Sequence, residues 1–194
     1  AFSSTAVSSA NGFATAPDFV APTASASTIA KTAGGMPGYI RQGGSYYVYA
    51  NVADSGNPAS GIASVAGNTS PFDTGITAAA LSSGSFTLAS VSYNRRSSAL
   101  TANTSLAAGS YTYTVTSTDA AGNARTQTYG VTVDNTAPGA SDIQTANGGS
   151  IAGRPEQNDT ITYTFTEPID PNSAVSGWAG GATDCVVRVN NGSS

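Results

Sequence analysis

Residues 106–138, LAAGSYTYTVTSTDAAGNARTQTYGVTVDNTAP, hold two alternating runs on either side of a turn signal. In both runs, large apolar or β-branched residues alternate with smaller ones, mostly Thr and Ser, as in half-buried antiparallel strands. The segment between them, DAAGN at 119–123, combines an Asp that bonds its own backbone with residues that tolerate positive φ, so it predicts a hairpin turn. The residues on one side of the two runs are Tyr111, Tyr113, Val115 and Ser117, then Tyr129, Val131 and Val133.

The composition favours strands over helices. Apolar residues make up 39% of the 194 residues, enough for a core, but charged residues make up only 9%, against roughly 25% in ordinary soluble domains. Long helix-forming side chains are therefore scarce, and β-branched and turn residues are abundant. The net charge is −4 and Lys31 is the one lysine. We therefore expect no nucleic-acid partner.

Residues that commonly carry chemistry are few. Histidine is absent, which removes the commonest general base and excludes the usual serine triad. The single Cys185 allows no disulfide within the chain, and its CVVRV context indicates a buried strand residue or an intermolecular contact. Glu167 and Asp170 are close in sequence, but the prolines around them favour a solvated loop over a glycosidase pair. We predict no enzymatic activity and no cofactor other than calcium.

The chain has the features of a secreted protein. No stretch approaches the ~18 consecutive apolar residues that a membrane span requires. Low charge, Ser/Thr richness and the start AFSST are typical of a mature chain after processing, so we expect an extracellular or cell-surface location. Four sequons give candidate glycosylation sites at Asn68, Asn103, Asn158 and Asn191.

Three regions can be distinguished along the chain. Residues 1–21 form an arm with apolar residues spaced among small polar ones, which is disordered, docked on its own domain or donated to a neighbour. Residues 22–134 predict an all-β sandwich, and residues 135–194 a second, partial one. The predicted strands of the first sandwich are 23–29, 45–52, 61–66, 76–81, 85–89, 92–101 and the two runs of the hairpin, with a break at Ser-Ser-Gly and a loop at 68–75. The arm's candidate interface residues are Phe2, Val7, Phe13 and Phe19.

An internal repeat supports this division. Asp18-x-x-Ala-Pro22 and Asp134-x-x-Ala-Pro138 share one junction pattern, 116 residues apart. After the second junction, the strand pattern of 160–165 follows at nearly the offset of 45–52 after the first. Because a full sandwich has about 100 residues, the remaining 56 residues predict an incomplete second domain.

Several motifs resemble known families. Leu106-x-x-Gly109-x-Tyr111 resembles the tyrosine corner of immunoglobulin-like domains, and TDAAGN with VDNTAP resembles bacterial immunoglobulin-like repeats of surface and secreted proteins. The run at 165–170, FTEPID, is similar to the FSEPVD motif of a related bacterial group. These resemblances imply tandem immunoglobulin-like sandwiches. The N-terminal AFSST and NGFATA resemble the mature start of camelysin/TasA-type biofilm proteins, which implies a donor-strand arm that links subunits into a fibre.

Two sets of residues are candidate binding sites. Asp54, Asp119 and Asp134 lie at predicted strand ends, where tandem sandwiches share cations, so they are candidate calcium ligands or turn caps. Tyr46, Tyr47 and Tyr49 could line a sugar-binding face, but alternation places at least one of them in the core.

The function predicted from these features is that of a structural subunit of an extracellular fibre or surface stalk. Its N-terminal arm would assemble copies by β-strand addition into a homopolymer. The alternative is an adhesin or carbohydrate-binding accessory module of a longer secreted protein, with a glycan or surface ligand as its partner.

Overall fold

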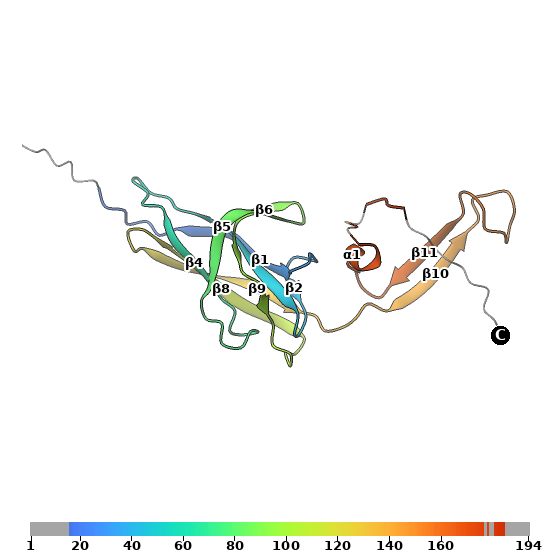
Figure 1. Cartoon of the computed structure of the whole chain (residues 1–194), viewed down its shortest axis with the longest axis horizontal. Coiled ribbons are helices and arrows are strands. Elements are labelled where there is room, and N and C mark those ends of the chain that lie inside the picture. Colours follow the sequence, from blue (N-terminus) through green and yellow to red (C-terminus); the bar gives the residue numbers. More distant parts are fainter. Residues whose placement is uncertain (1–15, 177, 179–180, 185–194) are drawn as a thin grey trace, which may run out of the picture. The chain divides into compact units, whose positions relative to one another are not determined.

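The computed structural model describes residues 16–176, 178 and 181–184. The chain divides into two compact units at Asp134 and Asn135 (Figure 1). In the part that the structure describes, from residue 16 on, the regular elements of the first unit are all β-strands. Its strands are β1 (Thr23–Lys31), β2 (Tyr39–Ile40), β3 (Ser45–Ala53), β4 (Ile62–Asn68), β5 (Ala79–Leu88), β6 (Val91–Ser97), β7 (Leu100–Thr101), β8 (Gly109–Asp119) and β9 (Ala124–Val133).

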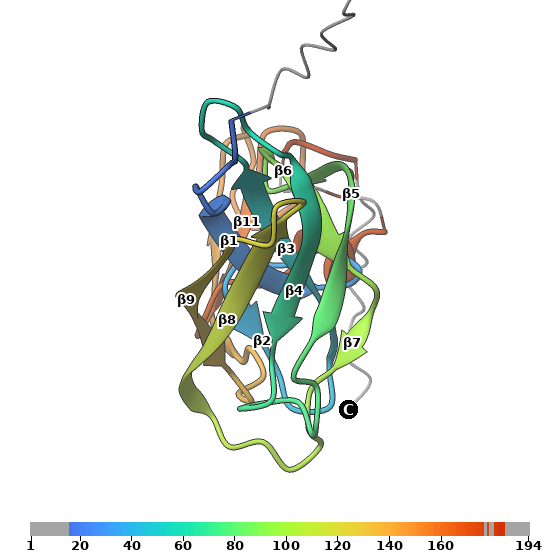
Figure 2. The same cartoon turned by 90° about the vertical axis from the view of Figure 1, so that its left-hand side faces the viewer.

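These strands form two sheets that share β5. One sheet runs β1-β3-β6-β5, with β7 also pairing with β3, and the other runs β4-β8-β9-β2. β5 starts against β4 and then pairs with β6, so hydrogen bonding continues from one sheet into the other. Figure 2 shows β8 lying between β4 and β9. All pairs are antiparallel except β2 with β9, where Tyr39 and Ile40 run parallel to Thr132 and Val133.

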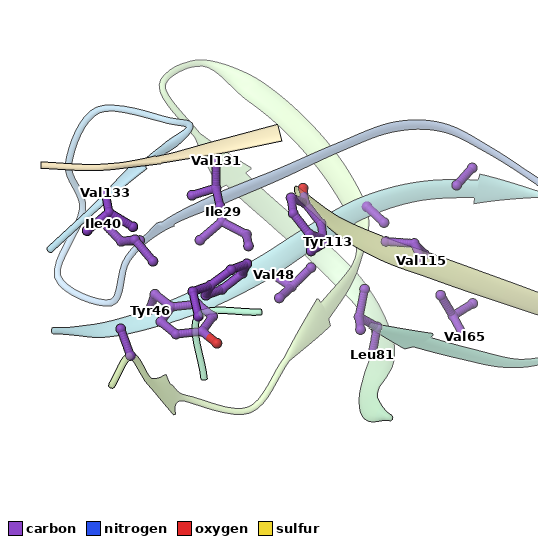
Figure 3. Close-up of a cluster of buried hydrophobic side chains, with 14 of the residues drawn as sticks. Ile29, Ile40, Tyr46, Val48, Val65, Leu81, Tyr113, Val115, Val131 and Val133 are labelled. Atoms are coloured by element: carbon purple, nitrogen blue, oxygen red, sulfur yellow. The ribbon is translucent and has the colours of Figure 1, made fainter. Parts of the chain in front are cut away.

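The main core lies between the sheets, as the alternation predicts. Alternate residues of β3 face residues of β8 and β9 across the sandwich, and all are buried (Figure 3). Together they form one contiguous apolar cluster, which is the chief stabilising feature of an antiparallel sandwich. Its central residues are Ile29, Tyr46, Val48, Val65, Leu81, Tyr113, Val115, Val131 and Val133.

The segment 68–75, which the sequence predicts to be a loop, closes one end of this core. Phe72 is only 1% exposed and packs against the rings of Tyr46, Tyr111 and Tyr113. Beside it, the Tyr46 hydroxyl donates a 2.8 Å hydrogen bond to Asp73, and burial raises the pKa of Tyr46. The loop is therefore part of the core, because its apolar residue covers an end that the strands leave open.

The predicted break at Ser-Ser-Gly is wrong. β5 continues through it with a register shift between Ser83 and Phe86, a β-bulge. A Cβ on Gly84 would lie 2.6 Å from the Phe86 ring, so glycine here leaves room for that ring. The chain turns instead at Ala89 and Ser90, both with positive φ. The predicted strand 92–101 is likewise interrupted, giving β6 and β7.

The second unit is simpler in the part that the structure describes. β10 (Ala140–Ala146) pairs antiparallel with β11 (Thr160–Phe165), and α1 (Pro171–Ala174) follows. Every residue of both strands is exposed. No helix among the described residues is long and apolar enough to span a membrane.

Candidate functional site

Three carboxylates converge at the end of the first sandwich where β1 begins. Asp18 comes from the segment before β1, Asp54 follows β3, and Asp119 ends β8. One oxygen of each lies within 4.8 Å of the others, and Asp18 and Asp119 are buried. The fold therefore brings together two of the three predicted calcium ligands and adds Asp18.

Backbone N–H groups satisfy two of these carboxylates. Asp18 accepts hydrogen bonds from Val20 N at 2.9 Å and Ser60 N at 2.8 Å. The bond from Val20, followed by those from Ser60, lowers the pKa of the Asp18 carboxyl. Asp54 accepts from Ser55 N and Gly61 N at 2.9 and 2.6 Å. Both side chains therefore hold loop backbone in place.

Asp119 and Asn123 form a clasp around the incoming chain. The backbone N–H and the side-chain amide of Asn123 each donate to Asp119 at 2.8 Å. The same amide nitrogen donates to the carbonyl oxygen of Asp18 at 3.0 Å. The predicted turn at 119–123 is present, closed by Asn123 and by Gly122 at φ 94°. It also fixes the place where the chain enters the sandwich.

Asp134 does not join this cluster. It lies beyond β9, and its backbone N–H donates to Ile40 O at 2.8 Å. The sequence groups it with Asp119 because both end a strand, but the ten residues of β9 separate the two ends by about 30 Å. The structure therefore does not place Asp134 with Asp54 and Asp119, and a role for Asp134 in calcium binding stays a prediction.

Calcium binding stays a prediction, with Asp18 in place of Asp134. Three carboxylates offer the hard oxygen donors that calcium prefers, but a full shell needs six to eight. The hydrogen bonds already account for all three residues as loop supports. Calorimetric titration of the chain and of Asp18→Asn with Ca²⁺ tests whether the cluster also holds an ion.

The three tyrosines of β3 do not form one sugar-binding face. Tyr46 lies in the main core and Tyr49 is buried in a second cluster on the outer face of the β1-β3-β6-β5 sheet. Tyr47 is half-buried beside that cluster, and the Arg96 guanidinium lies 4.3 Å from the centres of both the Tyr47 and Phe86 rings. Only Tyr47 of the three is therefore left near the surface, and it stacks with a cation.

Two predicted glycosylation sites are built into turns. The side-chain oxygens of Asn68 and Asn103 accept from the backbone and hydroxyl of the Ser two positions later. The Asn103 amide nitrogen also donates to Thr74 at 3.2 Å. Asn158 is exposed and has a positive φ of 77°. Asn191 lies outside the described residues.

The remaining predicted residues have simple surroundings. The carbonyl oxygen of Asp170 accepts from Ser173 N and Oγ at the start of α1, as expected for a loop that leads into a helix. Phe2, Val7, Phe13 and Cys185 lie outside the described residues. Phe19 is 79% exposed, so it does not pack into its own domain.

The tyrosine corner is present in the first unit. The Tyr111 hydroxyl donates to Ala107 O, four residues upstream, at 3.1 Å. This contact marks the strand that follows the crossover in immunoglobulin-like sandwiches. Residues 67–135 match the family model of the bacterial Ig-like domain.

This part of the first sandwich is similar to a bacterial immunoglobulin-like domain.

The match covers the end of β4 and all of β5 to β9, which include the clasp and the tyrosine corner. Bacterial immunoglobulin-like domains of this kind are found in surface or secreted proteins. No curated protein matches the chain. The resemblance of the N-terminus to camelysin/TasA proteins has no support in these comparisons.

Proposed function

We propose that this chain is a structural, spacing segment of a bacterial extracellular fibre or surface stalk. The observation that carries this proposal is the path of the chain through the first domain. The chain enters beside the β8–β9 turn, where Asn123 binds Asp18 O, and it leaves at Asp134, at the other end of β9 (Figure 1). A domain crossed lengthwise adds its own length, about 30 Å along β9, to an array.

Hydrogen bonds near the exit suit this role. β2 runs parallel to β9, and Gly38 O and Ile40 O accept from Thr132 N and Asp134 N, both at 2.8 Å. Tension between the two ends of the domain would slide these parallel strands past one another. Both bonds would then be loaded at once instead of opening one after the other. This arrangement supports a domain that keeps its fold under tension.

We further propose that the arm assembles copies by strand addition. The clasp fixes the chain from Asp18 onward, so we assign strand addition to residues 1–17 rather than to 1–21. Phe19 and Val20 border it and are 79% and 45% exposed. An added strand would gain backbone hydrogen bonds for affinity and side-chain pockets for register.

Deleting residues 1–15 tests assembly while keeping Asp18 and the clasp. We expect the full chain to form filaments visible by negative-stain electron microscopy, and the deleted chain to stay monomeric with an unchanged melting temperature. A second variant, Phe19→Ser in the full chain, keeps the arm length and removes one exposed candidate interface residue, so we expect it to weaken filament formation without changing the melting temperature. Filaments that persist after the deletion contradict strand addition by the arm.

The alternative is a binding module, and one observation favours it. Tyr47, Phe86 and Arg96 form an aromatic and cationic patch on an outer sheet face. Aromatic rings make flat contacts with sugars. Binding of the monomer to a glycan array, lost in Tyr47→Ala, would favour this function over the stalk.

A further inference from the structure

The β10–β11 pair repeats the register of β1–β3. In each pair, the register shifts between the second and fourth residues after the junction proline: Ala24/Ala26 after Pro22, and Ala140/Asp142 after Pro138. Beyond the shift, both ladders continue one residue at a time. A bulge at the same place in both pairs indicates that they are equivalent parts of a repeated domain.

This equivalence assigns each residue of β11 a counterpart in β3. Ala24 pairs with Val52, and Ala140 pairs with Phe165. Counting back from these pairs, Ile161, Tyr163 and Phe165 take the positions of Val48, Ala50 and Val52. The three β3 residues are 0%, 0% and 2% exposed, whereas the three β11 residues are 41%, 49% and 39% exposed.

The exposed residues form one stripe. Ile143 pairs with Tyr163 and is 59% exposed, so it lies on the same face. We call Ile143, Ile161, Tyr163 and Phe165 the β11 stripe. The opposite face carries Thr160, Thr162, Thr164 and Gln144. A two-stranded sheet with one apolar face is marginal alone and needs a further layer over that face.

The first domain shows what covers such a face. After β3, the chain crosses to the other sheet and forms β4, whose Val65 is 5% exposed in the same core as Val48. Residues 54–61 make this crossing. In the second unit, residues 166–184 contain no run of alternating apolar residues. The next such run is 185–189, CVVRV, with Cys185, Val187 and Val189 on one side.

We propose that residues 185–189 dock on the β11 stripe as the first strand of the opposing sheet, in the position that β4 takes in the first domain. The 19 residues after Phe165 are ample to cross the ~10 Å between packed sheets. The side with Cys185, Val187 and Val189 faces Ile161, Tyr163 and Phe165. This docking is a property of the second unit and does not depend on assembly into fibres.

Cys185 provides the test, because it is the only cysteine of the chain. Ile161→Cys, Tyr163→Cys and Phe165→Cys each place a thiol on the stripe, and Thr162→Cys and Thr164→Cys place one on the opposite face of β11. After mild oxidation of the full chain, we expect a disulfide within the monomer in at least one stripe variant, because the bond requires Cα atoms about 4.4–6.8 Å apart. The two threonine variants should keep free thiols. Non-reducing electrophoresis and peptide mass spectrometry identify the products.

Three results would overturn the proposal. The first is equal cross-linking by the threonine variants. The second is cross-linking only between chains, which would place a second copy on the stripe, and the third is the absence of any cross-link.

A measurement on the unsubstituted chain does not depend on whether the variants fold. We expect a thiol reagent to modify Cys185 at least about tenfold more slowly in buffer than in 6 M urea, because docking must open before the thiol reacts. Equal rates would also overturn the proposal.

Discussion

The β1–β3 pair and the β10–β11 pair have the same register but differ in the burial of their apolar residues. In the first, alternate residues of β3 are fully buried, while in the second the equivalent residues of β11 are exposed. The difference does not lie in the strands, which both alternate and both carry a bulge after the junction. It lies in the layer supplied by β4, β8 and β9, which has no counterpart over β11 among the described residues. The apolar face of an alternating strand is therefore buried only where a second layer of the fold covers it.

The largest expected effect comes from placing a charge at equivalent positions of the two pairs. Val48→Asp puts a carboxylate in the main core, where no described cation lies beside it. We expect it to destabilise the first domain by about 5 kcal/mol or more, enough to unfold many domains. Urea unfolding followed by near-UV circular dichroism measures this.

Ile161→Asp is the matched change in β11. It should alter the stability of the first domain by less than about 0.5 kcal/mol, because the site is exposed and belongs to another unit. If both variants destabilise the first domain to the same degree, the contrast between the two pairs is mistaken.

The next effect tests the clasp, which has no described counterpart in the second unit. Asp119→Ala removes two acceptors of Asn123 at a site 2% exposed. We expect a loss of about 2 kcal/mol, because the half-buried donors of Asn123 lose a charged acceptor. Asp142→Ala is the control, since its exposed contact with Gln144 should contribute about 0–0.5 kcal/mol. Thermal melts of both variants distinguish a clasp from an ordinary surface turn.

A smaller effect is expected at the tyrosine corner. Tyr111→Phe keeps the ring against Phe72 and removes only the hydrogen bond to Ala107 O. The domain should lose about 1 kcal/mol in the free energy of unfolding. In the second unit, Tyr163→Phe should leave the first domain unchanged. If Tyr111→Phe leaves the free energy of unfolding unchanged, the corner hydrogen bond does not stabilise the domain.

The pH dependence of stability gives the smallest expected effect. The Asp18 pKa is lowered in the folded state, chiefly by the Val20 N–H. Its contribution is therefore complete above the unfolded pKa of about 3.9 and is lost as the pH falls through the lower folded pKa. Melting temperatures between pH 6 and pH 2 should fall less steeply in Asp18→Asn than in the natural chain. Asp159, whose pKa is also lowered, lies in the second unit, so Asp159→Asn should leave the profile of the first domain unchanged.

Alternation and turn chemistry are enough to predict most strands of the first domain. The family resemblance also holds for the sandwich, because Tyr111 and the 119–123 turn act within a few residues of each other. The bulge in β5 could not be predicted locally. Ser-Ser-Gly is typical of a turn, and only the Phe86 ring and the pairing with β6 explain why the strand continues.

The acidic cluster also could not be predicted from local sequence patterns, because its residues are far apart in the chain. Asp18 and Asp119 are 101 positions apart in the sequence, and the amide of Asn123 connects them. The nearest signal in the sequence is the repeat itself, since Asp18 opens the same junction pattern as Asp134. The burial of Phe72 cannot be predicted for a related reason, because a single apolar residue in a loop has no periodicity.

The bond from Asn123 to the carbonyl oxygen of Asp18 has a consequence for how such chains grow. The clasp holds main chain at its upstream end, so it places no demand on the residues that precede Asp18. Asp134 takes the place of Asp18 in the second junction. A gene segment that begins at the junction aspartate and ends before the next one would encode both the clasp and the carbonyl group that the clasp binds. Such segments could then be duplicated or deleted without any further change at the junctions. The number of domains in the array could therefore vary by inheritance.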